Sequence, residues 1–283
     1  MKINLKYIND ALEYYRIENN DYRNRCYKCA EDINSINDFN NKAEEVYNII
    51  YNNKPVEIET LWERQNMVEL FGKHYNPFVT SVLALLGYRI HDKNMEDKNF
   101  NNLQRELHKK RVKETLTNDI YIRKLDGIRI SQMIWAAYFI NTKLIEVGRL
   151  QYESYKDYIR IHIPSGSKLE QEQVINSIKD SKKEIRKYFN LENIEYYCDS
   201  WLLSNQVNSI INKTSNIAKF YKLFEVKDGP DATKDILNFV FNVQECDNYN
   251  ELQENTSLQK ILKQQLIEKR KFKIGCGKMK DII

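Results

Sequence analysis

The spacing of apolar residues changes part-way along the chain, and this change limits the folds that the sequence can adopt. Up to about residue 143, apolar side chains recur three and four residues apart, which is the pattern of amphipathic helices. From about residue 144, many recur at every second position, as isoleucines do within 158–163, and this is the pattern of strands. The sequence therefore predicts a helical domain at 1–143 followed by an α+β domain at 144–283.

The composition is that of a globular protein. The chain has 283 residues, of which 42% are hydrophobic and 30% are charged, and at roughly 150 residues per domain this length corresponds to about two domains. These proportions exclude a disordered chain and a bundle of membrane spans. Runs without charged residues are shorter than the roughly 20 apolar residues of a span. The N-terminal segment also lacks the apolar core of a secretory signal, so we expect neither signal nor span.

Five cysteines are spread widely along the chain. An odd, scattered set favours a reducing compartment over a disulfide framework, so we expect a cytoplasmic protein. Cys26 and Cys29 have CxxC spacing, but a zinc site needs further ligands, and none of the four histidines is close in sequence. We predict that both thiols pack or lie exposed on a helix and that no metal is bound.

Basic and acidic residues nearly balance. The chain has 44 Lys and Arg against 40 Asp and Glu, which gives a formal charge of +4 and a pI of about 8.6. A dedicated nucleic-acid-binding domain carries a more concentrated basic surface, so nucleic acid is not the expected partner. The opposite interpretation depends on basic runs at 109–111, 182–187 and 269–273. The run from His108 to Arg111 is interpreted as a solvated helix face.

Local patterns place the other elements. Asn76-Pro77 marks a helix start, because proline is tolerated in the first turn, and Thr256 with Gln259 matches a capping box. The predicted helices are 5–18, 38–52, 60–72, 77–90 with 79–88 in the interior, 129–143, a helix from a Ser167–Glu170 capping box to Phe189, and a last helix after Thr256. The predicted strands are 145–152, 158–163, 194–203, 217–226, 237–243 and an edge strand within 269–280, with a turn at 228–231.

The strand–turn–helix at 158–189 is the most informative unit for function. Pro164-Ser-Gly-Ser-Lys168 ends the strand and a helix follows. The unpaired N–H groups and the positive dipole end of a helix N-terminus suit a phosphate or another anion, and Lys168 adds a charge. The alternative is a turn without a ligand, which many α+β domains contain. The single glycine here is fewer than the several of a P-loop or a dinucleotide fingerprint.

The run from Tyr196 to Leu203 places polar residues between aromatic ones. Strand alternation puts Cys198 and Ser200 on one face and Asp199 on the other. A buried carboxylate or thiol is costly unless it is paired, so the run suggests the wall of a cleft. The alternative is that Cys198 is a small core residue and Asp199 faces water. His162, likewise, fits a structural histidine as well as a catalytic one.

Six short motifs in one order resemble a known family. They are Val-Gly-Arg149-Leu-Gln-Tyr-Glu153, Ile161-His-Ile-Pro164, Cys198-Asp-Ser-Trp-Leu-Leu203, Ser215-Asn-Ile217, Phe239-Val-Phe241 and Thr256-Ser-Leu-Gln259. Together they resemble a bacterial group of GNAT-like acyltransferases, in which a helical N-acyltransferase N-terminal domain precedes a GNAT-like C-terminal domain. The resemblance covers about residues 145–277.

The resemblance implies a GNAT-like mixed β-sheet flanked by helices, open between its fourth and fifth strands. It implies that 158–163 pairs with the pantetheine of coenzyme A, that the following turn and helix receive the pyrophosphate, and that 194–203 forms the opposite wall. The residues implied to bind this co-substrate are Ile163, Pro164, Ser165, Gly166, Ser167 and Lys168. The turn lacks the family's glycine-rich Gln/Arg-x-x-Gly-x-Gly/Ala, so an acyl-carrier protein is an alternative donor to acetyl-CoA or a longer acyl-CoA. Asp199 also departs from the family pattern.

The implied function is acyl transfer from such a thioester to an amine of a small molecule or peptide. Only the neutral amine attacks, and a positioned base that removes its proton contributes about 10²–10⁴-fold to the rate. The candidates for this base are His162, Glu153 and Asp199. Cys198 is the candidate covalent nucleophile, and it would need an activating base. The alternative function is that of a non-catalytic GNAT-like module that binds an acyl thioester or a partner protein.

Overall fold

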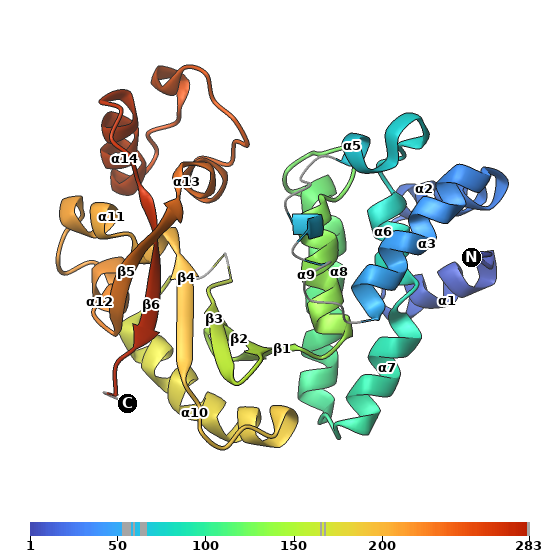
Figure 1. Ribbon diagram of the computed structural model, residues 1–283, viewed down its shortest axis with the longest axis horizontal. Helices are drawn as coiled ribbons and strands as arrows, with labels where there is room; N and C mark the ends of the chain where they lie inside the picture. The colour runs from blue at the N-terminus through green and yellow to red at the C-terminus, as the bar shows by residue number, and fades with distance from the viewer. Residues whose placement is uncertain (53–57, 59, 63–66, 165, 167, 282–283) are drawn as a thin grey trace. The chain divides into compact units, whose positions relative to one another are not determined.

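The chain forms two compact units, Met1–Ile145 and Glu146–Ile283, in a computed structural model (Figure 1). The structure describes all residues except 53–57, 59, 63–66, 165, 167 and 282–283. Each unit has its own set of elements and contacts. The predicted domains at 1–143 and 144–283 stay predictions, because compactness alone does not make a unit an independently folding domain.

Up to Ile140, the described chain is helical. Side chains of Asn4, Asn19 and Asn101 accept hydrogen bonds from backbone N–H groups in the first turns of three helices, which satisfies donors that a helix start leaves unpaired. The helix predicted over 60–72 lies partly outside the described residues. The elements are α1 (Leu5–Tyr14), α2 (Asn20–Ser35), α3 (Asn37–Tyr51), α5 (Met67–Phe71), the 3-10 turn η1 (Gly72–His74), α6 (Val79–Leu85), α7 (Tyr88–Asp97), α8 (Asn102–Tyr121) and α9 (Ile130–Ile140).

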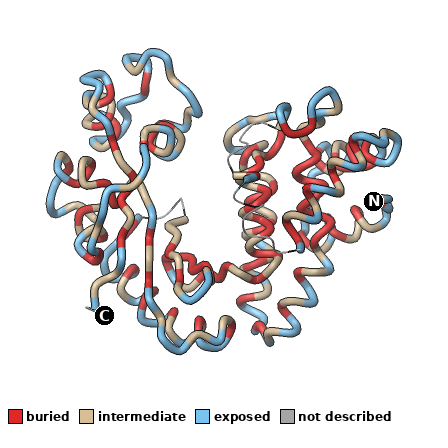
Figure 2. The backbone as a smooth tube through the Cα atoms, viewed as in Figure 1, coloured by how far each residue is buried: buried red, intermediate tan, exposed pale blue. Residues whose placement is uncertain are grey.

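The interior of this unit is built around α6 and α9. Every residue of α6 is buried, so the interior helix is confirmed over Val79–Leu85. The single helix predicted over 77–90 is wrong in its bounds, because α6 ends at Leu85 and a separate helix, α7, begins at Tyr88 after Gly87. The hydroxyl of Tyr51 donates to the carbonyls of Leu83 and Ala84 near the end of α6. Figure 2 shows buried positions running along the inner helices, with exposed positions on their outer sides.

A buried histidine pair corrects one prediction. His108 is fully buried, so the interpretation of 108–111 as a solvated face is wrong at its first residue. His91 Nε2 lies 3.5 Å from His108 Nδ1, and the Tyr15 hydroxyl lies 3.2 Å from His91 Nδ1. Burial lowers the pKa of His108 to about 3 and lowers the pKa of His91 well below its usual value. Both rings are therefore neutral at pH 7.

The chain from Leu144 onward contains a six-stranded sheet with the order β1-β2-β3-β4-β6-β5. The β3–β4 pair is parallel, whereas β2–β3, β4–β6 and β5–β6 are antiparallel. The sheet is therefore mixed, as predicted. The elements are β1 (Leu144–Val147), β2 (Leu150–Tyr155), β3 (Tyr158–His162), α10 (Gln171–Phe189), β4 (Tyr196–Ser200), η2 (Trp201–Leu203), α11 (Asn205–Ile210), α12 (Asn216–Tyr221), β5 (Phe224–Asp231), α13 (Thr233–Val240), η3 (Tyr249–Glu251), α14 (Ser257–Ile267) and β6 (Lys273–Met279).

Two predictions are wrong in the last third of the chain, because short apolar runs there fit both the helix period and the strand period. Residues 237–243 were expected to form a strand, but most of the run belongs to α13 or the coil after it, and Phe239 is 56% exposed. The strand expected over 217–226 is split, because Ser215 caps α12 and the strand begins only at Phe224. The Thr256–Gln259 capping box is confirmed.

Three strand boundaries also differ from the predictions. The expected turn at 228–231 belongs to β5, which is irregular between Asp228 and Asp231; an edge strand tolerates Pro230 because it needs no partner on its outer side. The strand expected over 145–152 is interrupted at Gly148, where φ is +59°. The segment within 269–280 is not an edge, because β6 lies between β4 and β5.

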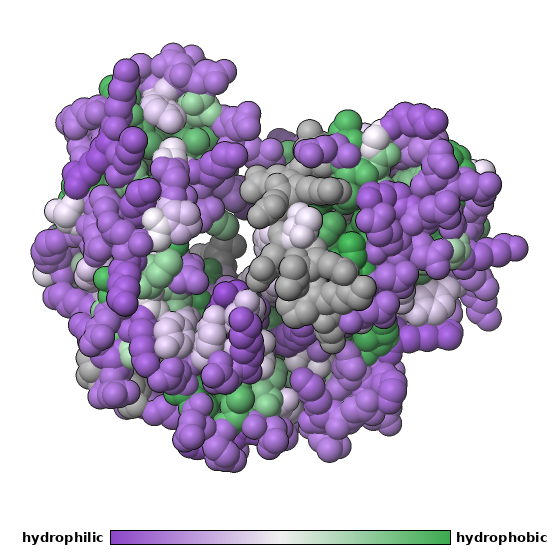
Figure 3. All heavy atoms as spheres, in the orientation of Figure 1, coloured by the Kyte–Doolittle hydropathy of each residue, from purple (hydrophilic) through white to green (hydrophobic). Residues whose placement is uncertain are grey.

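Within the described parts of the chain, no helix has the length and apolar character that crossing a bilayer requires. On the face drawn in Figure 3, hydrophilic residues predominate and hydrophobic ones appear in scattered patches. The apolar residues that recur with the helix and strand periods therefore lie mainly in the cores of the two units.

Candidate functional site

The sheet opens between β3 and β4, two strands that are fully described. They pair at Ile159 with Tyr196 and at Arg160 with Tyr197 and at no later position. β3 pairs with β2, and β4 with β6, over most of their lengths, so the strands stay in the sheet while their facing edges diverge (Figure 1). In chain order these are the third and fourth strands, whereas the resemblance implied the fourth and fifth. Diverging edges leave backbone groups with which an extended ligand can pair.

One face of this sheet is covered by α10. The Tyr152 hydroxyl lies 2.8 Å from Ser177 Oγ, and the Tyr196 hydroxyl lies 2.7 Å from Ser181 Oγ. Both serines are buried on α10. Since strand side chains alternate between faces, Cys198 lies on this covered face, two positions after Tyr196.

The other face carries three of the four residues predicted to be catalytic. Glu153 adjoins Tyr152, Asp199 adjoins Cys198, and His162 lies across from Gln151 in the β2–β3 register. His162 Nε2 is 2.7 Å from Glu153 Oε2, with the histidine side chain 27% exposed and the glutamate side chain 5% exposed. A carboxylate at this distance accepts the Nε2 proton and so orients the imidazole.

Aromatic and basic side chains continue this face across the strands. The Arg160 guanidinium lies 3.7 Å from the centre of the Tyr155 ring. The rings of Tyr158 and Tyr197 are 4.7 Å apart, and the Lys278 ammonium lies 5.7 Å from the centre of the Tyr197 ring. The surface next to His162 is therefore planar, partly apolar and partly cationic, which suits an aromatic or polar organic molecule.

Cys198 and Asp199 occupy different environments. Cys198 is 1% exposed, and burial raises the pKa of its thiol well above the usual value, with a further contribution from Asp199. Asp199 is exposed and lies opposite Cys276 across β4 and β6. Partial burial and the nearby Asp199 raise the pKa of Cys276 to about 11. This arrangement matches the interpretation of Cys198 as a small core residue and of Asp199 as water-facing.

The turn after β3 needs its glycine. Gly166 has a φ of +113°, and no atom lies within 4 Å of the place where a Cβ would be. Its backbone conformation excludes most other residues, while the space around it is open. Of the residues implied to bind the co-substrate, Ile163, Pro164, Gly166 and Lys168 are described, whereas Ser165 and Ser167 lie outside the described residues.

Arg149 belongs to this site although the sequence analysis did not name it as functional. Its Nε donates to the Lys168 carbonyl at 3.1 Å and its Nη1 donates to the Pro164 carbonyl at 2.9 Å. The residue is 8% exposed. An arginine directly after Gly148 in a short hairpin was the available signal. The contact lies 15 and 19 residues further along the chain, and no local pattern reveals such a partner.

The helix after the turn begins with acidic residues. Glu170 is the N-cap of α10 and makes no side-chain capping bond, and Glu172 lies in the first turn. The predicted Ser167–Glu170 capping box is therefore wrong, because Glu170 itself takes the N-cap position. Carboxylates stabilise a helix N-terminus through its dipole, but they also compete there with an anionic ligand. Lys168 and Arg149 supply positive charge at this turn.

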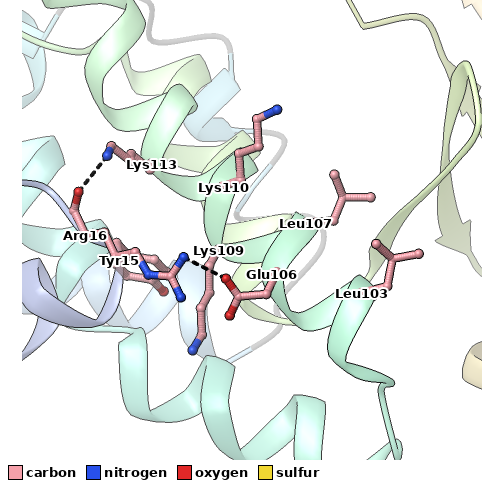
Figure 4. A pocket seen from close by; sticks show the side chains of 8 residues that line it. All are labelled: Tyr15, Arg16, Leu103, Glu106, Leu107, Lys109, Lys110 and Lys113. Carbon is pink, nitrogen blue, oxygen red and sulfur yellow. Dashed lines mark hydrogen bonds and ion pairs between the residues drawn. The ribbon is translucent and has the colours of Figure 1, made fainter.

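Two surface pockets contain none of the predicted site residues. A pocket of about 390 Å³ in the first unit lies beside α8 (Figure 4). Its charges are engaged within the unit, since Arg16 pairs with Glu106 at 2.8 Å and Lys113 donates to the Arg16 carbonyl at 2.6 Å. A pocket of about 510 Å³ lies in the second unit among residues from Phe241 to Gln253.

The described residues contain no group of three or more His, Cys, Asp or Glu side chains arranged to hold a metal ion. Cys26 and Cys29 are both buried in α2, and burial raises the pKa of both thiols. Both thiols therefore pack in the core, which is one of the two environments predicted for them; the other was an exposed helix surface.

A family model described as the GNAT-like C-terminal domain matches residues 98–279. The match covers more than half of the chain and begins within the helical part, before the predicted boundary at 144. It agrees with the family resemblance deduced from the sequence motifs. No curated protein sequence matches the chain.

Several solved structures of acyltransferases are similar to the chain in fold. The chain is similar to the crystal structure of an acyltransferase in complex with decanoyl-CoA, with 14% identity, a TM-score of 0.65, and coverage of 96% of this chain and 98% of that chain. An acyltransferase in complex with CoA and 10C-teicoplanin matches with 18% identity and a TM-score of 0.64, over 74% of this chain and 68% of that chain. One in complex with decanoyl-CoA and teicoplanin matches with 19% identity and a TM-score of 0.62 over the same shares. The predicted fold, α+β with a GNAT-like mixed sheet, is confirmed.

Proposed function

The chain belongs to the family of the GNAT-like C-terminal domain, and we propose that it transfers an acyl group from a coenzyme A thioester to an amine. One observation carries this proposal: the sheet opens between β3 and β4, and His162 at the end of β3 forms a histidine–carboxylate pair with Glu153 on the neighbouring β2. Structures of the same fold bind CoA, octanoyl-CoA and decanoyl-CoA. The sequence resemblance supports the same donor.

The acyl donor would lie along the open edge of β3. Its pantetheine would pair with backbone groups of this strand, and its diphosphate would meet the turn at 164–168. Support for the diphosphate comes from Lys168, the N-terminus of α10 and the open space at Gly166. An acyl-carrier protein remains the alternative donor, because its phosphopantetheine carries the same thioester.

His162 would act as the general base. A lysine-like amine with a pKa of about 10.4 costs roughly 4–5 kcal/mol to deprotonate at pH 7. Because Glu153 accepts the proton on Nε2, the basic lone pair of the imidazole is on Nδ1. The ammonium first releases one proton to solvent, and the neutral amine nitrogen attacks the thioester carbonyl. His162 takes a second proton from this nitrogen, and the C–S bond breaks. His162 then returns that proton to the departing thiolate, so the transfer from the neutral amine is balanced and the proton lost by the ammonium is the net proton released.

Glu153 would hold His162 in the productive tautomer and stabilise its protonated form, as carboxylates do in histidine-containing triads. Asp199 is on the same face but is exposed, which makes it a weaker candidate base. Cys198 lies on the face covered by α10, with a raised thiol pKa. We therefore propose direct transfer to the amine, with no acyl intermediate on Cys198.

The acceptor would approach the face that carries His162. Tyr158 and Arg160 are four and two positions before His162 on the same face of this region, and they would contact the part of the acceptor next to the amine. We propose a small molecule or a peptide as the acceptor. Solved acyltransferases of the same fold are in complex with CoA and 10C-teicoplanin and with decanoyl-CoA and teicoplanin. The scattered cysteines, all of which are free among the described residues, support a cytoplasmic reaction.

Product formation tests this function. The purified chain is incubated with acetyl-, octanoyl- or decanoyl-CoA and a panel of aliphatic, aromatic and peptide amines, and mass spectrometry follows the acylated amine and free CoA. We expect equal amounts of both products, and a loss of both with His162→Gln. Binding of acyl-CoA without any acylated amine would favour the non-catalytic module over the enzyme.

A further inference from the structure

We propose that Arg149 is a positioning residue for the acyl donor, and this inference rests on the proposed function. Its guanidinium would hold the turn between β3 and α10 in the shape that receives the diphosphate of coenzyme A. Arg149 would not touch the donor itself. It would act through the backbone of Pro164 and Lys168, whose carbonyls it binds at 2.9 Å and 3.1 Å.

The two hydrogen bonds fix both ends of the turn. Pro164 follows β3, and Lys168 lies two residues before Glu170, the N-cap of α10. A guanidinium is planar and presents its N–H groups in a rigid fork. One arginine side chain therefore sets the spacing between the two carbonyls. Between these two ends, Gly166 has a left-handed φ of +113° and open space where a Cβ would be.

The hydrogen bond from Arg149 to the Lys168 carbonyl also sets the direction of the amide N–H in the same peptide group. In a planar trans peptide, the N–H points opposite to the C=O. Because the Lys168 carbonyl points toward Arg149, the N–H of Leu169 in the same peptide points away from the guanidinium. This donor stands directly before α10, next to the N–H groups of the first helical turn, and adds to the set that a helix N-terminus offers to an anion.

The position of Arg149 is itself fixed by the fold. Gly148 and Arg149 form the connection between β1 and β2, and Gly148 has the left-handed φ of +59°. Ser177 on α10 accepts a hydrogen bond from the backbone N–H of Leu150 at 3.2 Å and donates to the carbonyl of Val147. The hairpin is thus attached to the second turn of α10, the helix whose N-terminus follows the turn.

Charge supplies a second reason for an arginine here. Around the start of α10, Lys168 contributes +1 and Glu170 and Glu172 contribute −2, a formal sum of −1. Arg149 brings this sum to zero. Without it, a diphosphate would approach a locally negative helix start. Lysine at this position would keep the charge but lose the fork, so substitution can separate the two contributions.

The test compares two probes that differ in the diphosphate. Dissociation constants of decanoyl-CoA and of S-decanoyl-pantetheine, which has no diphosphate, are measured by calorimetry for the wild type, Arg149→Met and Arg149→Lys. Arg186→Met is the control, because it removes an equal charge near the other end of α10. We expect Arg149→Met to weaken decanoyl-CoA about 10- to 100-fold and Arg149→Lys about 5- to 10-fold, in the range of one or two charge-assisted hydrogen bonds. The pantetheine probe should change less than about threefold in each variant, as should both probes with Arg186→Met.

The outcomes separate this inference from the function on which it rests. If the wild type binds decanoyl-CoA but Arg149→Lys and Arg149→Met keep its affinity, the positioning role is wrong and the proposed donor stands. Equal weakening of both probes would reduce Arg149 to a structural role and overturn the inference. If the wild type binds neither probe, the proposed donor fails and the inference fails with it. If Arg149→Met does not fold, the affinities of Arg149→Lys test the positioning role instead. Hydrogen exchange of the wild type is the second measurement, and we expect CoA but not pantetheine to protect the amides of 164–170.

Discussion

His162 Nε2 on β3 lies 2.7 Å from Glu153 Oε2 on β2, and the two side chains are diagonal neighbours on the face opposite α10. The partly exposed imidazole can meet a substrate, while the nearly buried carboxylate cannot. This difference in exposure is the reason for the different roles that we propose for two residues that the sequence analysis offered as alternative bases. It also sets the order of effects expected from their substitution.

Substitution of the pair should lower turnover more than donor binding. His162→Gln is expected to reduce kcat by about 10²–10⁴-fold, the usual contribution of a general base. Glu153→Gln keeps an oxygen that can accept from Nε2 but loses the charge that stabilises the protonated ring, so we expect a smaller loss of about 10- to 100-fold. The KM for acyl-CoA should change less than about threefold in both variants. Steady-state rates of CoA release measure these effects.

Asp199→Asn is the matched control, since it removes a carboxylate from the same face. Its kcat should stay within about threefold of the wild type. A loss with Asp199→Asn as large as with His162→Gln would assign the base to Asp199 instead.

Cys198 should be dispensable for chemistry. Cys198→Ala is expected to keep kcat within about threefold, because the thiol is buried on the α10 face and its raised pKa disfavours the thiolate. Cys198→Ser should be less stable than Cys198→Ala by about 1–3 kcal/mol, since the hydroxyl needs a hydrogen-bond partner in the core. Urea denaturation measures the difference. An acyl adduct on Cys198, seen by mass spectrometry of quenched enzyme, would contradict direct transfer.

The acidic start of α10 should weaken donor binding. Glu170→Gln and Glu172→Gln are each expected to tighten CoA about two- to fivefold, because each removes a negative charge from the helix end that would receive a diphosphate. The gain should shrink in 0.5 M salt, where exposed charges are screened. Glu192→Gln, beyond the other end of the helix, serves as the control and should leave the dissociation constant unchanged. Equal effects at both ends would remove the diphosphate from this turn.

The buried histidines should make the protein less stable in acid. The unfolded chain binds protons on His91 and His108 near the ordinary pKa of 6.5, whereas the folded protein does not bind one on His108 until about pH 3. Unfolding therefore takes up protons below pH 6.5, and the free energy of unfolding falls as pH falls through this window. Between pH 7.5 and 5, His108 alone should cost about 2 kcal/mol.

Urea denaturation at several pH values tests this expectation. His108→Leu, which cannot be protonated, should flatten the dependence between pH 6.5 and 5 whatever its effect on stability at pH 7.5. An unchanged slope would mean that His108 is not the group responsible.

The sequence predicted the long helices and regular strands well. It gave wrong predictions where a run fits both the helix period and the strand period, because tertiary contacts then decide which forms. The helix to Phe189 and the isoleucine alternation in β3 are each long or regular enough to fit one period only. The run at 237–243 fits both the strand period and the helix period. In the structure Ile236 and Leu237 are buried on one side of a helix, whereas Phe239 is exposed. Packing on the rest of the unit decides such a case, and that information is not local.

The candidate site was predicted by residue type but not by partner. The sequence offered His162 and Glu153 separately, because the β2–β3 register that brings them together is set by the hairpin at Lys156, which has a φ of +53°. Arg149 was missed for a similar reason, since its two carbonyl partners lie beyond β3. Conversely, His108 looked solvated because it begins a basic run, and only the packing of α7, α8 and α9 buries it.

Binding of acyl-CoA to the wild-type chain tests the central claim most directly. A titration with CoA, acetyl-CoA and decanoyl-CoA, followed by thermal unfolding and calorimetry, should give a saturable site. At 100 times the dissociation constant, the ligand should add about 2.7 kcal/mol to the free energy of unfolding and raise the melting temperature. The acyl-CoA esters should bind at least as tightly as CoA. No stabilisation by any of the three, at concentrations up to the millimolar range, would contradict coenzyme A as the donor.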